Sequence, residues 1–336
     1  MLEHGGRLQR AARQYGIAVE DWLDLSTGIS PFGWPVGDIP ARAWHRLPED
    51  DDGLEAAARA FYGSENLLPV AGTQAALQAL PWLRAPSRVG VIAPGYAEHA
   101  HAWRAAGHAV ETLPAGALFA QAGAFDVIVL IHPNNPGAET FPREALLGLH
   151  ATLAARGGWL VLDEAFIDAT PDASLIASSG RAGLIVLRSV GKFFGLAGAR
   201  AGFVAAAAPL REALRERLGP WTLTGPTRHV LARALSDRCW HETARARLRQ
   251  ASTALSALLE RRGMDDGAGT AFFQWRRTPH AHALHAALAR RGVLVRLFDE
   301  PASLRFGLPA DEAARTRLEG ALSEAIAEVL GQESCA

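Results

Sequence analysis

The sequence predicts an α/β fold in which a large domain with a mostly parallel central sheet is joined to a small α+β domain. Between Leu67 and Phe203, short runs of valine, isoleucine and leucine alternate with segments of helical spacing, which is the pattern of a parallel sheet. After Pro220 the pattern changes to long helix followed by short strands and further helices. The length of 336 residues also exceeds one typical domain.

The apolar runs of the first part are predicted strands. They lack the polar alternation of half-exposed strands, which indicates burial on both faces. The runs are Val89–Ala93, Phe125–Ile131, Trp159–Leu162 and Leu184–Leu187. Good helix formers with helical spacing lie between them, at Gln74–Leu83, Glu98–Ala106 and Arg143–Arg156. Functional side chains are therefore expected at the carboxyl ends of these strands.

The second part is predicted to begin with one long helix, from about Pro226 to Arg262. The predicted strands that follow are Thr270–Trp275, Val293–Arg296 and Ser303–Phe306, and the predicted helices are His280–Arg290 and Asp311–Leu330. We expect three parts: an N-terminal arm (residues 1–46) that joins the small domain, a large domain (47–245) and a small C-terminal domain (246–336).

Composition narrows the functional classes. Apolar residues make up 49% and charged residues 21%, as in a globular protein with a substantial core. A formal net charge of −1 argues against a nucleic-acid-binding or membrane-surface protein, which would carry a basic face. The two cysteines, Cys239 and Cys335, form no paired motif, and the N-terminus lacks the apolar segment of a signal peptide. The expected location is the cytoplasm, with no metal site.

Two turns that precede helices carry candidate ligand-binding groups. Ala71-Gly72-Thr73 opens a helix, where free backbone N–H groups favour a phosphate, although a plain helix cap has the same pattern. His132-Pro133-Asn134-Asn135-Pro136-Gly137 follows a strand directly and leaves asparagine amides as donors. A simple tight turn explains this segment equally well in isolation.

A carboxylate stands at the end of a strongly apolar strand, in Asp163-Glu164-Ala165-Phe166. Desolvating it is costly unless a cation meets it, and a pyridinium N–H is such a group. The alternatives for this segment are a metal site or the cap of a following helix.

A lysine follows the next strand, in Arg188-Ser189-Val190-Gly191-Lys192-Phe193-Phe194-Gly195-Leu196-Ala197-Gly198-Ala199-Arg200. Apolar and glycine neighbours favour a neutral amine, which can form a Schiff base with a carbonyl group. Ser189 and Arg200 flank the lysine and can both hold a phosphate. The segment does not match a P-loop, and an exposed lysine is the alternative interpretation.

In this order, these groups resemble the fold-type I, aspartate-aminotransferase-like superfamily of enzymes that use pyridoxal 5′-phosphate. The resemblance spans about Leu25 to Leu330. It implies that Lys192 carries the cofactor and that Asp163 pairs with the pyridine nitrogen. A homodimer is implied as well, because sites of this superfamily form between two subunits.

The resemblance also implies further contacts with the cofactor and the substrate. Asn135 is expected to bind the phenolic oxygen of the cofactor, and Tyr96 to stack on its ring. The cofactor phosphate is assigned to Gly72, Thr73, Ser189 and Arg200. Arg305, in Ser303-Leu304-Arg305-Phe306-Gly307, matches the arginine that binds the substrate carboxylate.

Two positions depart from the superfamily pattern. Phe166 replaces the usual tyrosine of the Asp-Glu-Ala-Tyr motif, so its phenol contact to the cofactor is lost. Leu47, in Arg46-Leu47-Pro48, replaces the tyrosine expected to reach the cofactor phosphate of the partner subunit. Phosphate binding is therefore expected to depend more on Ser189 and Arg200.

Within the superfamily, the chain resembles the branch that joins histidinol-phosphate aminotransferases and L-threonine-O-3-phosphate decarboxylases. The leader His4-Gly5-Gly6 and the segment Leu23–Gly33 favour the decarboxylases, whose leader helps to bind the substrate phosphate. A flexible terminus is the other interpretation of the leader. The resemblance implies decarboxylation of L-threonine O-3-phosphate, a small phosphorylated amino acid, to 1-aminopropan-2-yl phosphate, with Lys192 or a water returning a proton. The candidate substrate contacts are His4, Gly5, Gly28, Asn135, Arg296 and Arg305.

Two other functional classes share this fold. A histidinol-phosphate-like aminotransferase would depend on an α-keto acid. The fold also serves as the effector domain of transcription regulators, but we expect too little chain before Leu25 for their winged-helix domain. The presence of both Lys192 and Asp163 also argues against a scaffold without catalysis.

Overall fold

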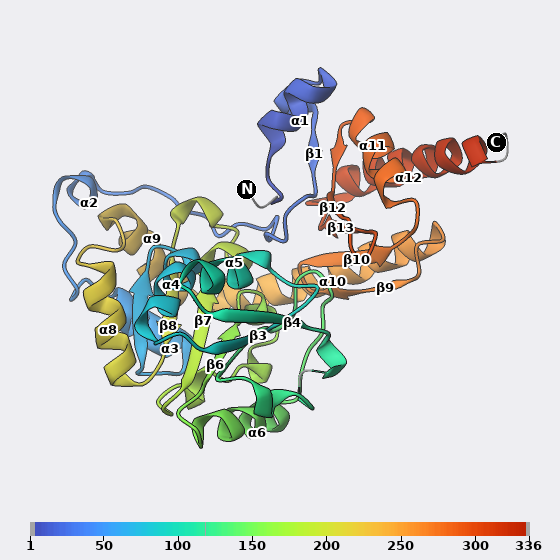
Figure 1. Cartoon of the computed structure of the whole chain (residues 1–336). Coiled ribbons are helices and arrows are strands. Elements are labelled where there is room, and N and C mark those ends of the chain that lie inside the picture. The colour runs from blue at the N-terminus through green and yellow to red at the C-terminus, as the bar shows by residue number, and fades with distance from the viewer. Residues whose placement is uncertain (1–3, 118, 334–336) are drawn as a thin grey trace. The chain divides into compact units, whose positions relative to one another are not determined.

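The computed structural model describes residues 4–117 and 119–333 of the chain (Figure 1). These residues form two compact units. The larger unit comprises Gly33–Asn135 and Glu139–Ala244, and the smaller comprises the described parts of Met1–Phe32, Pro136–Ala138 and Arg245–Ala336. The predicted division into domains, with boundaries after residues 46 and 245, stays a prediction beside this partition.

The larger unit is built on a seven-stranded mixed sheet. All neighbouring strands pair in parallel except β8, which is antiparallel to both β2 and β7. In spatial order the strands are β2 (Leu67–Val70), β8 (Gly202–Ala205), β7 (Leu184–Ser189), β6 (Trp159–Asp163), β5 (Val127–Ile131), β3 (Arg88–Ile92) and β4 (Ala109–Leu113). The predicted mostly parallel sheet is confirmed.

Helices cover both faces of this sheet, because its central strands are apolar on both sides. Alternate residues of the strands, such as Val127, Val129 and Val161, form one core cluster with side chains of α4 (Thr73–Ala79), α5 (Ala97–Ala105) and α8 (Ala208–Leu218). The helix α6 (Arg143–Ala154) lies on the other side (Figure 1). The remaining helices of the unit are α2 (Ala41–His45), α3 (Leu54–Tyr62), α7 (Val190–Phe193) and α9 (Gly225–Ser236).

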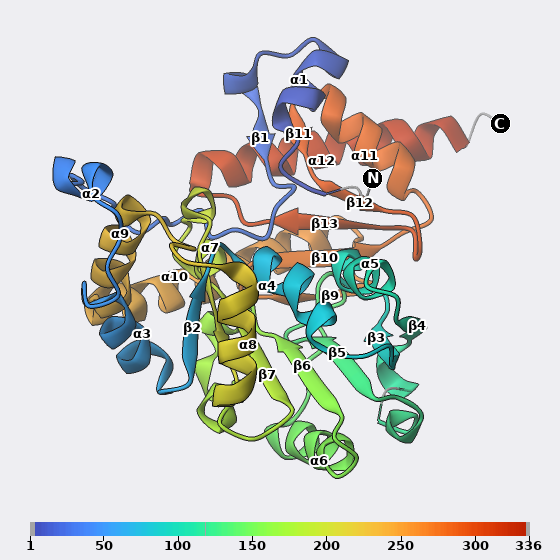
Figure 2. The same cartoon turned by 60° about the vertical axis from the view of Figure 1, so that its left-hand side comes forward.

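The smaller unit contains a four-stranded antiparallel sheet in the order β12 (Arg296–Phe298), β13 (Ser303–Gly307), β10 (Phe273–Arg277) and β9 (Gly267–Thr270). A second, two-stranded sheet pairs β1 (Leu23–Asp24) in parallel with β11 (Val293–Leu294). The helices α11 (Ala281–Arg290) and α12 (Glu312–Glu333) contact each other along the unit (Figure 2). The helix α1 (Leu8–Tyr15) also belongs to this unit.

The single long helix predicted over Pro226–Arg262 is wrong, because the chain forms α9 and then α10 (Arg238–Arg261). The break falls at Asp237, whose backbone is not helical. Its Oδ1 accepts a hydrogen bond from Trp240 N at 3.1 Å, as an N-cap of α10, and its Oδ2 accepts one from Trp34 Nε1 at 3.1 Å. A side chain capping the next helix therefore ends the continuous helical pattern.

Two predicted strands are each divided in the structure. Thr270–Trp275 contains a turn, because Thr270 Oγ1 accepts a hydrogen bond from Phe272 N at 3.1 Å and the chain folds back as a β9–β10 hairpin. Val293–Arg296 contributes to two sheets, with β11 pairing with β1 and β12 pairing with β13. Neither break contains a glycine or asparagine that would mark it in the sequence.

Within residues 4–117 and 119–333, no helix is both long and apolar enough to cross a membrane. Cys239 is an exposed free thiol, and Cys335 lies outside the described residues.

Candidate active site

Several predicted cofactor residues lie at the carboxyl ends of parallel strands in the larger unit. Asp163 is the last residue of β6 and Ser189 is the last residue of β7. The first turn after β7 is α7, which carries Lys192. Because β6 and β7 are hydrogen-bonded neighbours, the sheet brings these three residues to one edge.

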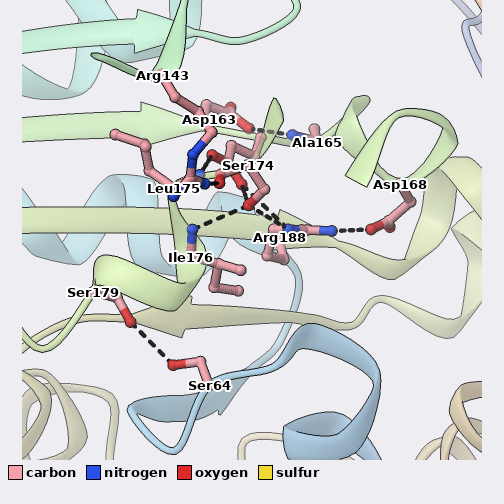
Figure 3. Close-up of polar contacts among 11 residues, drawn as sticks. Ser64, Arg143, Asp163, Ala165, Asp168, Ser174, Leu175, Ile176, Ser179 and Arg188 are labelled. Carbon is pink, nitrogen blue, oxygen red and sulfur yellow. Dashed lines mark hydrogen bonds and ion pairs between the residues drawn. The ribbon is translucent and has the colours of Figure 1, made fainter. Parts of the chain in front are cut away.

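The carboxylate of Asp163 is buried, with 4% of the residue exposed. Its Oδ1 accepts a hydrogen bond from Ala165 N at 3.1 Å (Figure 3), and its Oδ2 lies 2.9 Å from His99 Nε2. His99 comes from α5 and is buried as well. This histidine is not among the predicted site residues, although it follows Tyr96 by three residues on a predicted helix.

Lys192 is half-buried, and its Nζ lies 5.8 Å from the ring centre of Phe166. Phe166, which makes this cation–π contact, stands where the superfamily has a tyrosine. Gly191 beside the lysine is closely packed, because a Cβ there would lie 3.0 Å from Ala197 Cα. The glycine therefore lets the lysine turn pack directly on the segment that leads to Arg200.

The four residues assigned to the cofactor phosphate come together. Ser189 pairs with Gly202 in the β7–β8 ladder, and a Cβ on Gly202 would lie 3.0 Å from Thr73 N. Gly72 has a φ of +76°, and a Cβ there would lie 3.0 Å from Arg200 Nη2. Side chains at either glycine would obstruct this group of hydroxyl, amide and guanidinium donors. The cluster suits a phosphate dianion.

Tyr96 and its neighbours form a hydrogen-bonded chain beside Asp163. The hydroxyl of Tyr96 donates to Gln74 Oε1 at 3.1 Å, and its ring stands edge-on to His99 at 6.0 Å between centres. Burial raises the pKa of Tyr96 to about 12, with Glu98 and Asp163 adding to the effect and Arg200 opposing it. The phenol therefore stays protonated at neutral pH.

Asn135 is held by the residue before it, because Asn134 Oδ1 accepts a hydrogen bond from Asn135 N at 2.8 Å. Asn134 is completely buried, and its Nδ2 donates to Pro94 O at 2.9 Å and to Glu139 Oε2 at 2.7 Å. The two asparagines thus have different surroundings. Asn134 fixes the turn, and the half-buried Asn135 stays the candidate for contact with the cofactor.

A buried charged network lies beside the strand ends (Figure 3). Arg188 Nη1 donates to Glu164 Oε2 at 3.2 Å and to Ser174 Oγ at 2.9 Å, and Arg188 Nη2 pairs with Asp168 Oδ1. Glu164 Oε1 also accepts a hydrogen bond from Leu175 N at 2.8 Å. Neither a metal site nor a helix cap explains Glu164, because its carboxylate is an ion-pair partner of Arg188.

The network also affects the charges of its members. Burial raises the pKa of Glu164, although Arg188 opposes this effect. Burial works against the charge of Arg188, yet Asp168 and Glu164 together raise its pKa above the ordinary value. The ring of Tyr62 lies 4.6 Å from the Arg188 guanidinium carbon and covers it. The arginine is therefore held as a cation next to Ser189.

In the smaller unit, two of the predicted substrate residues face each other. Arg296 in β12 is directly opposite Arg305 in β13. Both guanidinium groups lie near the Phe298 ring, at 5.2 Å and 6.0 Å from its centre. Burial, and then the neighbouring Arg296, lower the pKa of Arg305 to about 10, so it remains charged at neutral pH. Two close cations on an apolar surface are suited to an anionic ligand.

The glycine leader lies in the same unit. Gly6 N donates to Ser26 Oγ at 2.8 Å, and Ser26 O accepts a hydrogen bond from Arg305 Nη2 at 2.9 Å. His4 and Gly5 precede this contact directly, and Gly28 is buried two residues after Ser26. His4, Gly5, Gly28, Arg296 and Arg305 therefore all belong to the smaller unit, whereas Asn135 belongs to the larger one.

Comparison with known proteins identifies the family. The model of the family "Aminotransferase class I and II" matches residues 42–319. This chain belongs to that family. The superfamily resemblance and the predicted fold class are thereby confirmed.

Individual relatives of this aminotransferase-family chain are similar over almost their complete length. It is 56% identical to a threonine-phosphate decarboxylase of Pseudomonas aeruginosa, over 96% of this chain and 97% of that protein. It is 40% identical to a threonine-phosphate decarboxylase of a Sinorhizobium species, over 96% and 98%. The fold is similar to that of histidinol-phosphate aminotransferase from Sinorhizobium meliloti in complex with pyridoxal 5′-phosphate, with a TM-score of 0.85, 20% identity and coverage of 98% and 96%.

That similar aminotransferase structure contains pyridoxal 5′-phosphate. The residues of the larger unit fit the group. Because Gly72 has no side chain, a space remains beside Arg200. This space suits the cofactor phosphate. The buried carboxylate of Asp163 suits a protonated ring nitrogen. Lys192 supplies the amine.

Proposed function

We propose that this chain decarboxylates L-threonine O-3-phosphate to (R)-1-aminopropan-2-yl phosphate and CO2, as a step of cobalamin biosynthesis. The observation that carries the proposal is the 56% identity, over nearly both complete chains, to a protein with the decarboxylase activity in its name. Such similarity supports transfer of the substrate together with the fold. The buried Asp163, the lysine turn and the arginine pair supply the groups that the reaction requires.

Pyridoxal phosphate, when bound, supplies an aldehyde that condenses with an amine and a ring that withdraws electrons from the bonds at Cα. We assign Asp163 to the ring nitrogen, where its carboxylate holds the proton on that atom. His99 and the N–H of Ala165 bind the two oxygens of Asp163 and fix its orientation. Tyr96 supplies an apolar ring face, and Asn135 an amide for the phenolic oxygen.

Lys192 Nζ is assigned two tasks. It attaches the cofactor, and after CO2 has left it delivers a proton to Cα of the product. Loss of CO2 with uptake of one proton at Cα balances the reaction without a keto acid or an oxidant. Arg200, Ser189 and Thr73 are assigned to the cofactor phosphate, with Gly72 leaving the space for it.

The substrate carries a carboxylate and a phosphate, and Arg296 and Arg305 are assigned to these anions. The pair is the reason for expecting a substrate with two anionic groups, because two adjacent guanidinium groups repel each other unless anions separate them. His4, Gly5 and Gly28 are assigned to the same region as parts of the leader and of the segment that it contacts.

We also propose that the protein is a homodimer. Among the exposed large apolar side chains of the larger unit, three lie in or near α2 and α9: Trp44 at 66%, Leu47 at 65% and Trp221 at 60%. The helix α2, which carries Trp44, contacts α9, and Trp221 lies shortly before α9. Large apolar side chains that are exposed on neighbouring elements are typical of a protein interface. Sedimentation velocity of the wild type and of Trp44→Ser tests this, with a dimer expected only for the wild type. The cytoplasmic location stays a prediction.

Two parallel assays test the proposed reaction against an aminotransferase. One contains L-threonine O-3-phosphate without any keto acid, and the other contains L-histidinol phosphate with 2-oxoglutarate. We expect an aminopropanol phosphate in the first and no glutamate in the second. Glutamate formation without decarboxylation would replace the proposal with an aminotransferase.

A further inference from the structure

We propose that Ser26 is a positioning residue that couples the glycine leader, Gly5–Gly6, to the substrate-binding group Arg305. The inference rests on the proposed function, because it takes Arg305 as a group that binds a substrate anion. Its basis is that one buried serine contacts the leader through its hydroxyl group and the arginine through its backbone carbonyl group. All the residues involved belong to the smaller unit.

The hydroxyl group of Ser26 has one defined orientation. It donates to Asp24 Oδ1 at 2.6 Å, which leaves its oxygen to accept the hydrogen bond from Gly6 N at 2.8 Å. Ser26 N donates to the same Asp24 oxygen at 2.9 Å. Since only 2% of Ser26 is exposed, water does not compete readily for these bonds. Asp24 thus fixes the orientation of the Ser26 hydroxyl group, and this hydroxyl group holds the backbone of Gly6 in position.

The carbonyl group of Ser26 lies between the leader and the arginine. It accepts the hydrogen bond from Arg305 Nη2 at 2.9 Å. A Cβ on Gly5 would lie only 2.1 Å from the same oxygen, so the backbone of Gly5 packs directly against it. This contact explains the first glycine of the leader. The second, Gly6, has a φ of +77°, which other residues adopt only with strain.

The chain on either side of Ser26 is tied to the strand that carries the arginine. Gly307 N, at the end of β13, donates to Leu25 O at 2.7 Å. A Cβ on Gly307 would lie 2.4 Å from Thr27 O, so the segment runs closely along the strand end. Arg305 is two residues away in the same strand. Ser26 therefore has little freedom to move without disturbing Arg305.

A consequence for substrate selection follows from this arrangement. Leader contact and arginine orientation depend on the same residue, so the anion-binding group is set correctly only when the leader is in place. The leader thereby acts on substrate affinity through Ser26, in addition to any direct contact from His4. The effect is expected in KM for the phosphorylated substrate rather than in kcat, because the reacting bonds are not touched.

The test compares Ser26→Ala with the wild type, both loaded with pyridoxal phosphate. Hydrogen exchange of the peptide that spans residues 4–15 is measured without substrate, and KM and kcat are measured with L-threonine O-3-phosphate. We expect faster exchange at the leader and a KM raised about tenfold, which corresponds to the loss of one buried hydrogen bond, with a much smaller change in kcat. Ser30→Ala is the matched control. This serine is also buried, but its hydroxyl group accepts a hydrogen bond from Phe32 N at 3.2 Å and not from the leader.

A second variant, Gly5→Ala, disturbs the same contact from the leader side by forcing a methyl group against Ser26 O. If both changes act by displacing the leader, the double variant Gly5→Ala/Ser26→Ala has a KM no higher than the worse single variant. Fully additive increases would contradict the coupling, as would unchanged leader exchange or a fall in kcat without a change in KM. If the wild type releases no CO2, the proposed function fails, whereas the exchange measurement still decides whether Ser26 holds the leader.

Discussion

The imidazole of His99 lies 2.9 Å from the carboxylate of Asp163, and both side chains are buried. The histidine comes from α5 and the aspartate from the end of β6, so the contact joins a helix to the carboxyl end of a central strand. The second carboxylate oxygen is bound by Ala165 N. Both oxygens of the proposed ring-nitrogen partner therefore have fixed positions.

Replacing His99 tests whether this contact supports the reaction. His99→Leu removes the donor to Asp163, and we expect kcat to fall by about tenfold to 100-fold, as for the loss of a hydrogen bond to a charged group. His99→Gln keeps a donor and is expected to recover part of the loss. Steady-state kinetics and the dissociation constant of the cofactor are measured for both. Wild-type kcat in His99→Leu would show that Asp163 does not need the histidine.

Arg188 is expected to matter for stability more than for chemistry. Arg188→Met leaves Glu164 and Asp168 buried without their cation, which is expected to lower the free energy of unfolding by about 3–5 kcal/mol. Urea denaturation of the cofactor-free protein measures it. Arg215→Met is the control, because Arg215 pairs with Glu212 on the surface and its loss is expected to change stability little. Equal stability of both variants would contradict the role of the buried network.

Tyr96 gives a prediction for alkaline pH. Its pKa in the folded protein, about 12, lies above the ordinary value of 10.0. A raised pKa means that its contribution to stability is present below about pH 10 and is lost as the pH rises through 12. The chain has three tyrosines, and burial raises the pKa of Tyr62 above its ordinary value as well, so the phenolate absorbance of the cofactor-free wild type is compared with that of a variant. Tyr96→Phe is expected to remove a step near pH 12. Loss of a step near pH 10 instead would contradict burial of the phenol.

The arginine pair gives a prediction for substrate affinity. Arg305→Gln is expected to raise KM for L-threonine O-3-phosphate by about 30-fold or more, because a buried ionic contact to the substrate is lost. Arg296→Gln is expected to raise KM and also to weaken inhibition by inorganic phosphate. Arg305→Lys keeps the charge without the planar donor pair, and a partial loss is expected. Unchanged KM and unchanged phosphate inhibition in both glutamine variants would show that the arginine pair does not bind the substrate.

The sequence predicts well the features that depend on local pattern. The apolar runs of β5 and β6 and the residues that end them, such as Asp163, are visible without a structure because burial on both faces leaves a continuous apolar sequence. Features that depend on one side chain's partner are not visible. The helix break at Asp237 depends on a cap, and the pairing of Glu164 with Arg188 joins residues 24 positions apart.

The contacts of His99 and Ser26 were missed for the same reason. His99 looks like an ordinary helical histidine until α5 is placed against β6. The leader glycines are visible in the sequence, but the reason for them is not: Gly5 packs against Ser26 O, and Gly6 has a φ of +77°. The resemblance to a family predicts the chemistry of the site. The residues that hold the site in position are found only from the packing in the structure.

The deciding measurement for the proposed decarboxylase is the release of CO2 from L-threonine O-3-phosphate without any keto acid. The wild type with bound pyridoxal phosphate is compared with Lys192→Ala, which is expected to fold normally but to lose both the visible absorbance of the attached cofactor and turnover. We expect sustained CO2 release from the wild type, with one 1-aminopropan-2-yl phosphate formed for each CO2, and none from the variant. Absence of CO2 from the wild type, or full activity of Lys192→Ala, would contradict the proposal.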